Sequence, residues 1–245
     1  QLKDSNQISP NLMDYLDLVA LGTVADVAPL TGVNRAFVRQ GLKILSNRMR
    51  LGLKLLIDKS GINSSPTSYH LGYILGPKLN APGRIGPADL ALRLLCSTST
   101  SEANDLCEQI EELNTQRREI ENITREQALT QIDKSQSENS IIWAASEGWH
   151  PGVVGIVASR LKDKFNKPSI VIGFDGIDGK GSGRSVDGYD LGHAIQRLQR
   201  EGLIQKGGGH KMAAGLTLTM DQLKPAMGRL CELAEKAKIM KAEAQ

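Results

Sequence analysis

The sequence predicts an α/β protein: a mainly helical first part, one long connecting helix, and a second part in which helices pack on a mixed sheet. Three observations support this. Apolar residues recur at helical spacing in several segments between residues 34 and 96. No glycine or proline then interrupts the chain until after Ile132. From Asn139 on, short apolar runs alternate with helical patterns. We therefore expect three parts, residues 1–98, 99–135 and 136–245.

In the first part, apolar spacing predicts helices over Asn34–Arg48, Leu51–Lys59 and Ala88–Cys96. The run Asp17–Val27 reads equally as a buried helix or a strand, and Tyr69–Leu75 as a short apolar element. The segment 76–87 contains three glycines and three prolines, which predicts a loop. Ser99 and Glu102 have the spacing of a capping box, and we expect them to begin the long helix.

In the second part, the alternation predicts a sheet with helices packed on it. The Gly-rich run Lys180–Ser185 suggests an edge strand. The expected strands are Ile141–Ala145, Ser169–Phe174 and Met212–Thr219, and the expected helices are Gly152–Phe165, Asp190–Leu198 and Asp221–Lys238.

Composition excludes several classes. Of 245 residues, 40% are hydrophobic and 23% charged, as in a globular protein. The cysteines are Cys96, Cys107 and Cys231, an odd number without a CxxC pair, which argues against disulfides and a zinc site and fits a reducing cytoplasm. No apolar run of about 18 residues predicts a membrane span. Residues 1–10 lack the apolar core of a signal peptide.

Charge is distributed unevenly along the chain. The net charge is only +3, but residues 101–140 carry ten acidic and four basic residues, whereas residues 150–215 carry ten basic and six acidic ones. A basic face is therefore expected in the last third. Aromatic residues are only 4% of the chain. If this protein binds nucleic acid, phosphate contacts should contribute more than base stacking.

Two glycine-rich motifs in the second part suit anion binding. Gly207, Gly208 and Gly209 precede His210, and consecutive glycines let backbone N–H groups converge on an anion while the histidine donates to a phosphate oxygen. The alternative is a flexible loop with an incidental histidine. In the run Gly181–Ser185, Arg184 can grip a phosphate bidentately, unless this is a tight hairpin with a solvated arginine.

Other candidates are single residues. Asp26 lies in the apolar run GTVADVAP, where a carboxylate is costly to bury unless it is paired or binds Mg²⁺ or Mn²⁺; it could also be a helix cap or a turn residue. Arg84 lies on the Pro/Gly-rich segment NAPGRIG, either facing a ligand or on a surface turn. Trp149 reads as a core residue, with base stacking as the alternative. His150 could cap the following helix or touch a phosphate.

Taken together and in this order, the motifs resemble the RecJ branch of the DHH phosphoesterases. The resemblance covers nearly the whole chain, and the combination is far more specific than any one motif. It rests on DYLDLVALGTVADVAPL, NAPGRIGPADLALRLL, LNTQRREIE, GWHPGVVGIVASRL, GKGSGRS and GGGHKMAAG.

The resemblance implies the end of a DHH-type domain, a connector helix, and a DHH-associated domain. It implies a 5′-to-3′ exonuclease for single-stranded DNA that uses Mn²⁺ or Mg²⁺ in bacterial recombination and repair. Candidate partners are single-stranded DNA and a single-strand-binding protein or other repair proteins, without a membrane. Asp26 would be a metal ligand and catalytic residue and Arg84 would face the substrate. The implied backbone-holding residues are Arg184, Ser185, Gly207, Gly208, Gly209 and His210, with His210 also catalytic.

The sequence departs from the family pattern because it contains no Asp-His-His run and no second acidic cluster beside an apolar strand. One aspartate cannot hold two divalent cations. We therefore expect a fragment with little nuclease activity alone. Three rival hypotheses remain: a binding module for single strands that does not cut, a phosphodiesterase for oligonucleotides or cyclic dinucleotides, and a tRNA-editing domain. The last shares a GGGH-like loop but should lack the Asp26 segment.

Overall fold

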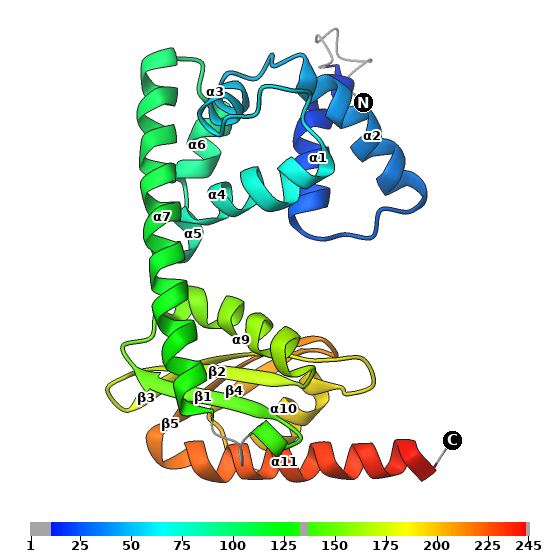
Figure 1. Cartoon of the computed structure of the whole chain (residues 1–245), viewed down its shortest axis with the longest axis vertical. Coiled ribbons are helices and arrows are strands. Elements are labelled where there is room, and N and C mark those ends of the chain that lie inside the picture. Colours follow the sequence, from blue (N-terminus) through cyan, green and yellow to red (C-terminus); the bar gives the residue numbers. More distant parts are fainter. Residues whose placement is uncertain (1–10, 133–136, 244–245) are drawn as a thin grey trace, which may run out of the picture. The chain divides into compact units, whose positions relative to one another are not determined.

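The computed structural model describes residues 11–132 and 137–243, with side chains up to residue 237. The chain forms two compact units, Gln1–Gln116 and Arg117–Gln245, here called the first and second units. Helix α7 (Thr100–Gln131) contributes residues to both (Figure 1). The prediction of a long helix after Ser99 is confirmed. The backbone N–H of Glu102 donates to Ser99 Oγ at 3.4 Å, as in the predicted cap. The division into three parts stays a prediction.

The described residues of the first unit form helices joined by turns and short connections, without a strand. Its core contains apolar residues of α1, α2, α3, η3, α6 and the beginning of α7. The run 17–27, which could have been a strand, is helical as far as Ala25 and then forms a turn. The elements are η2 (Leu12–Tyr15), α1 (Leu16–Ala25), α2 (Gly32–Ser46), α3 (Leu51–Lys59), the π-helix η3 (His70–Leu75), α4 (Gly76–Asn80), α5 (Pro82–Ile85) and α6 (Leu90–Cys96).

Glycine sets the distance between two helix pairs in this unit. A Cβ on Gly41 of α2 would lie 2.0 Å from the carbonyl oxygen of Leu16 on α1, and a Cβ on Gly52 of α3 would lie 2.0 Å from that of Leu94 on α6. Backbone at that distance leaves no space for any side chain. The helices therefore pack closely because glycine stands at each contact.

The prediction of a loop over residues 76–87 is wrong, because this segment forms α4 and α5. Helix α4 continues directly from η3, so Pro77 lies within a helical run, and Pro82 stands in the first turn of α5. Gly86 ends the second helix in an extended conformation. Proline is therefore accommodated within helical structure in this segment.

A buried ion pair joins α1 to the start of α3. Asp17 is only 4% exposed. Arg50 donates to it twice, from Nε to Oδ2 at 2.8 Å and from Nη2 to Oδ1 at 3.2 Å. The hydrogen bond to Asp17 raises the pKa of Arg50. Because a buried carboxylate left alone would be strongly destabilising, this bidentate pair fixes how the two helices meet.

The second unit contains one five-stranded mixed sheet in the order β1-β2-β3-β5-β4. Strands β1 and β2 are parallel and every other neighbouring pair is antiparallel. The mixed sheet predicted from the sequence is present. Its elements are β1 (Ile142–Glu147), α9 (Pro151–Phe165), β2 (Ser169–Asp175), β3 (Asp178–Arg184), α10 (Leu191–Arg200), β4 (Lys206–His210), β5 (Ala213–Thr219) and α11 (Met220–Glu243).

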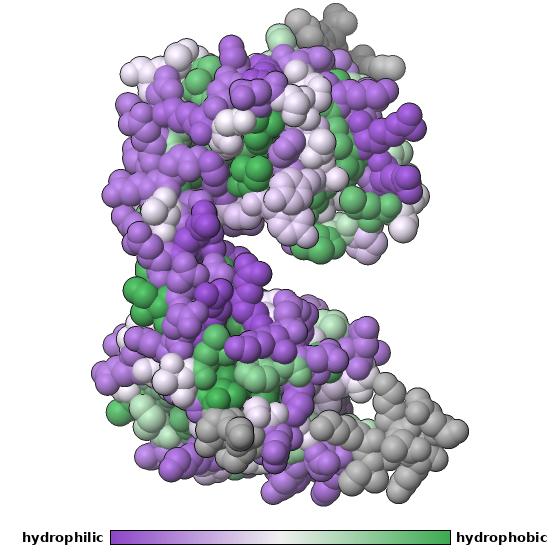
Figure 2. All heavy atoms as spheres, viewed as in Figure 1, coloured by the Kyte–Doolittle hydropathy of each residue, from purple (hydrophilic) through white to green (hydrophobic). Residues whose placement is uncertain are grey.

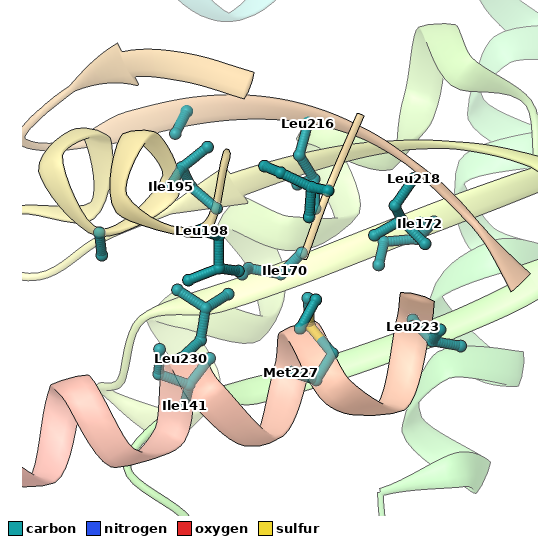
Figure 3. Packing of buried hydrophobic residues seen from close by; sticks show 14 of the residues in the cluster. Ile141, Ile170, Ile172, Ile195, Leu198, Leu216, Leu218, Leu223, Met227 and Leu230 are labelled. Carbon is teal, nitrogen blue, oxygen red and sulfur yellow. The ribbon is translucent and has the colours of Figure 1, made fainter. Parts of the chain in front are cut away.

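Helices cover the two faces of this sheet differently. On one face, α10 and α11 pack over the apolar side chains of β2 and β5, and Figure 3 shows Leu223, Met227 and Leu230 of α11 pointing toward the sheet. On the other face, α9 packs against β1, β2 and β3, joined by Ala128 of α7. We call these the core face and the α9 face. The core face carries the larger apolar cluster.

Two expectations about strands are corrected. The Gly-rich run expected at an edge is β3, which lies in the middle of the sheet between β2 and β5. The segment Gly207–His210, expected to be a loop, belongs to β4, the strand at the edge of the sheet. Glycine weakens a strand when nothing requires it, but here it lets helices and neighbouring side chains approach the backbone. Gly192 of α10, for example, lies against the carbonyl group of Gly209.

Hydrophilic residues cover most of the visible surface, and hydrophobic residues are exposed in several places (Figure 2). Apolar side chains reach the surface of the first unit, where Val27 is 86% and Tyr73 74% exposed. The rings of Tyr69 and Tyr73 stack with centroids 5.0 Å apart. Of the helices in residues 11–132 and 137–243, none has both the length and the apolar character needed to span a bilayer.

Gly41→Ala should destabilise the first unit by about 1–3 kcal/mol or more, because the new methyl group would overlap the carbonyl oxygen of Leu16. Gly22→Ala is the matched control. Nothing lies within 4 Å of its Cβ position in α1, so this change should stabilise the helix by about 1 kcal/mol.

Urea unfolding followed by far-ultraviolet circular dichroism checks this pair of variants. Both tryptophans, Trp143 and Trp149, belong to the second unit, so the fluorescence transition should stay where it is. Equal stability of the two variants would contradict the packing described for α1 and α2.

Candidate nucleic-acid interface

The candidate site lies on the α9 face of the sheet, where β3, β5 and β4 run side by side. Successive residues of a strand point to opposite faces. In β3 the Cβ positions of Gly181 and Gly183 meet the apolar side chains of Ile172 and Ile170, so these glycines point to the core face. Lys180, Ser182 and Arg184 alternate with them and therefore point to the α9 face.

The strand register carries this face across the sheet, because residues directly opposite in antiparallel strands share a face. Arg184 of β3 lies opposite Ala213 of β5, which lies opposite His210 of β4. We call these three the Arg184 row. The middle row is Ser182, Gly215 and Gly208, and the Lys180 row is Lys180, Thr217 and Lys206.

The middle row is open above β5 and β4. A Cβ on Gly208 would have no heavy atom within 4 Å, and one on Gly215 would meet only the carbonyl oxygen of Gly181 at 3.8 Å. Neither glycine has a positive φ angle. Packing within the unit therefore does not require glycine at these two positions. Their absence of side chains leaves strand backbone uncovered, where a ligand can approach closely.

Arg184 is positioned without a carboxylate. Its Nη1 donates to Ser182 Oγ and to the carbonyl oxygen of Gly183, both at 2.9 Å. Its Nη2 lies 3.1 Å from the Cβ position of Gly155, so glycine in α9 makes room for the guanidinium group. Within the described ranges, no acidic side chain forms an ion pair with it.

Burial lowers the pKa of Arg184, because half-buried surroundings disfavour the charged form. An arginine remains protonated at any physiological pH. The guanidinium group can therefore donate hydrogen bonds to an anion. The negative charge of that anion would offset the desolvation cost of burying the arginine. The arrangement is typical of a phosphate-binding arginine.

The three consecutive glycines of β4 do different things. A Cβ on Gly207 would lie 2.5 Å from a methyl group of Ile195, on the core face. One on Gly209 would lie 2.3 Å from the carbonyl oxygen of Ala213. Only Gly208 belongs to the open middle row. Two glycines of the motif are thus needed for packing, and one is available to a ligand.

The remaining predicted residues of this unit are placed as follows. His210 is exposed at the end of β4, in the Arg184 row. Ser185 is 1% exposed and donates to the carbonyl oxygen of Tyr189 at 2.8 Å, so its hydroxyl group holds the chain after β3. Trp149 is buried, as its core interpretation predicted, and its indole N–H donates to Gln127. His150 caps α9 by accepting the N–H of Gly152 at 3.0 Å.

The first unit contains the other two candidates. Arg84 is exposed on the short helix α5 rather than on a loop. Asp26 is exposed at the C-terminal cap of α1, so the premise that its carboxylate is buried is wrong. Asp26 and Arg84 therefore belong to the first unit, whereas the Arg184 row belongs to the second.

The described residues do not fit a complete two-metal centre. Two divalent cations need several carboxylates or histidines around them. In the part of the chain that the structure describes, no three His, Cys, Asp or Glu side chains gather at one place. Asp26 can supply one carboxylate and no more. The described side chains alone therefore do not provide the metal site that two-metal hydrolysis needs.

Sequence reasoning missed the second basic row. Lys180 and Lys206 are both exposed and both point to the α9 face. The signal was present in GKGSGRS, where glycines alternate with polar residues at a period of two. Interpreting this run as a tight hairpin or an edge strand left the alternation unused. Lys206, in contrast, could be aligned with Lys180 only through the register of β5.

Comparisons of sequence and of structure both find similarity to RecJ exonucleases. The family model of the DHHA1 domain matches residues 138–236. The single-stranded-DNA-specific exonuclease RecJ of Bacillus subtilis is 40% identical over 225 residues, 91% of this chain, and RecJ of Escherichia coli is 40% identical over 240 residues, 94% of it. The crystal structure of RecJ in complex with Mg²⁺ from Thermus thermophilus has a TM-score of 0.85 at 32% identity and covers 96% of this chain.

These relatives are much longer than the chain. It spans 28% of the B. subtilis protein and 41% of the E. coli protein. It also covers 36% of the chain in the T. thermophilus crystal structure. The similarity therefore concerns one part of each relative.

Gly209→Ala should destabilise the second unit by about 1–3 kcal/mol or more, because its methyl group would overlap the backbone of β5. Gly208→Ala, one residue away, should keep or raise stability by about 0.5–1 kcal/mol, since glycine within a strand costs conformational entropy. Urea unfolding followed by tryptophan fluorescence measures both. Similar losses in the two variants would show that β4 does not have the register given above.

Proposed function

We propose that this chain binds the single-stranded DNA substrate of a RecJ-like exonuclease. The chain is homologous to the RecJ exonucleases over most of its length and contains a DHHA1 domain. The observation that carries the proposal is the open α9 face beside Arg184. There a cation without a described carboxylate partner lies next to exposed strand backbone. A phosphodiester backbone has the charge and the shape for this surface.

The chemistry of the face indicates backbone recognition without base readout. Its donors are a guanidinium group, hydroxyl groups, lysine ammonium groups and the His210 ring, all of which suit phosphate oxygens. No aromatic side chain belongs to the three rows. Binding should therefore depend on phosphate and salt, with little preference for sequence.

The reaction itself is proposed for the longer protein of which the relatives are examples. We propose 5′-to-3′ hydrolysis of single-stranded DNA in bacterial recombination and repair, in the cytoplasm. Mn²⁺ or Mg²⁺ would activate a water molecule and neutralise charge on phosphorus when bound. Similar RecJ crystal structures contain Mg²⁺ or Mn²⁺. Asp26 is proposed as one metal ligand, Arg84 as a substrate contact, and His210 as a residue near the scissile phosphate.

The roles of the proposed backbone-holding residues follow from their positions. Arg184 would donate to phosphate oxygens, with Ser182 fixing its orientation. Gly208 would let the sugar-phosphate backbone lie against the strand. Gly207, Gly209 and Ser185 would position the backbone of the site without contacting DNA, because they pack against or hydrogen-bond to other residues of the second unit.

Arg184→Ala should weaken binding of single-stranded DNA about ten-fold or more, and equally for different base sequences, because phosphate contacts carry no base information. Arg184→Lys should restore part of the affinity, since it keeps the charge without the planar fork. Fluorescence anisotropy with oligothymidylate and a mixed-sequence oligonucleotide measures this.

Arg200→Ala is the control for this series. Arg200 is exposed on α10, which packs on the core face, and removal of its charge should leave affinity nearly unchanged. A loss confined to one oligonucleotide sequence would argue against backbone recognition by Arg184.

The purified chain should bind single-stranded DNA in the presence of Mn²⁺ but degrade it little, because its described side chains do not form a two-metal centre. Release of nucleotides from a 5′-labelled strand measures the activity. Rapid degradation that Asp26→Ala abolishes would contradict this expectation and make Asp26 part of a sufficient catalytic site.

A further inference from the structure

The Lys180 row adds a second basic position to the proposed DNA-binding face. Lys180 and Lys206 lie on either side of Thr217, just as Arg184 and His210 lie on either side of Ala213. Neighbouring strands are about 4.8 Å apart, so the two outer residues of a row have Cα atoms about 10 Å apart. Each row thus presents two donor groups across one smaller residue of β5.

The two rows are too far apart to hold the same phosphate. Lys180 and Arg184 are four residues apart along β3, which corresponds to about 13 Å at 3.3–3.4 Å per residue. The same separation applies to Lys206 and His210 along β4. Two rows at this distance can contact two different phosphates of one strand.

Both lysines are available for such a contact. Each is exposed, and within residues 11–132 and 137–243 neither forms an ion pair with a carboxylate. The next row on this face begins with Asp178, opposite Thr219, which ends the basic area on one side. Gly215 and Gly208 lie between the two basic rows and present no side chain to obstruct a backbone.

We propose that Lys180 and Lys206 together bind a second phosphate of the single strand, so that its backbone runs along β5 from the Arg184 row to the Lys180 row. This inference rests on the proposed function, because it extends the DNA contact of the same face. It makes the two lysines positioning residues that hold the strand in line with β5.

The test measures the affinity of oligothymidylate against salt concentration for the whole chain and its variants. Each lysine–phosphate contact on a single strand contributes a slope of about −0.7 to log K against log[salt]. The double variant Lys180→Gln/Lys206→Gln should make this slope shallower by about 1.4, with a loss of affinity of roughly ten-fold at about 150 mM salt. Tryptophan fluorescence establishes that the variant is folded.

Lys224→Gln is the matched control, because Lys224 is exposed on α11, which packs on the core face. It should leave both the affinity and the slope as they are. An unchanged slope in the double variant, with Arg184→Ala still weakening binding, would overturn the second phosphate contact and leave the proposed function standing. A control that lost as much per charge would overturn it too, since net charge would then suffice. Absence of salt-dependent binding in the unaltered chain would overturn both proposals.

Discussion

Alternation of side chains along β3, β5 and β4 is the constraint on which the candidate site depends, because it separates the residues that build the core from those that can meet a ligand. In β3 the odd positions are glycines against apolar side chains, and the even positions are polar and point to the α9 face. A shift of register by one residue would bury Arg184 and expose the contacts of Gly183. The apolar cluster on the core face therefore fixes the orientation of the basic rows.

Arg184 illustrates how the fold positions a partly buried cation for the proposed phosphate contact. Burial of a guanidinium group costs free energy that a carboxylate would normally offset. Here the compensation comes from Ser182 Oγ and one carbonyl oxygen, while Gly155 leaves space for the planar group. Because the side chain is already ordered, a phosphate would bind without the full entropic cost of fixing it. The site is thus preorganised by residues that need not touch DNA.

The sequence predicted the buried elements of the second unit better than the residues of its open face. Helical and strand periodicity located β1, β2, β5 and the long α7, because burial imposes these patterns directly. Glycine and proline led to wrong predictions of loops. The backbone freedom of glycine and the fixed φ angle of proline are also compatible with strands and helices. Pro77 and Pro82 lie in helices, and the glycines of residues 207–209 continue a strand. The pairing of Lys180 with Lys206 depends on register across a third strand, which no local pattern records.

The turn after α1 has features that stability of the first unit does not explain. Asp26 puts a carboxylate at the C-terminal end of the helix, where the macrodipole is negative and disfavours a second negative charge. Val27 follows with φ of +57°, a conformation that a β-branched residue rarely adopts and that costs about 1–3 kcal/mol. A cation near Asp26 would reverse the electrostatic penalty, since both the carboxylate and the helix end attract positive charge. A metal ion bound by Asp26, as proposed above, would therefore gain from both the carboxylate and the helix end.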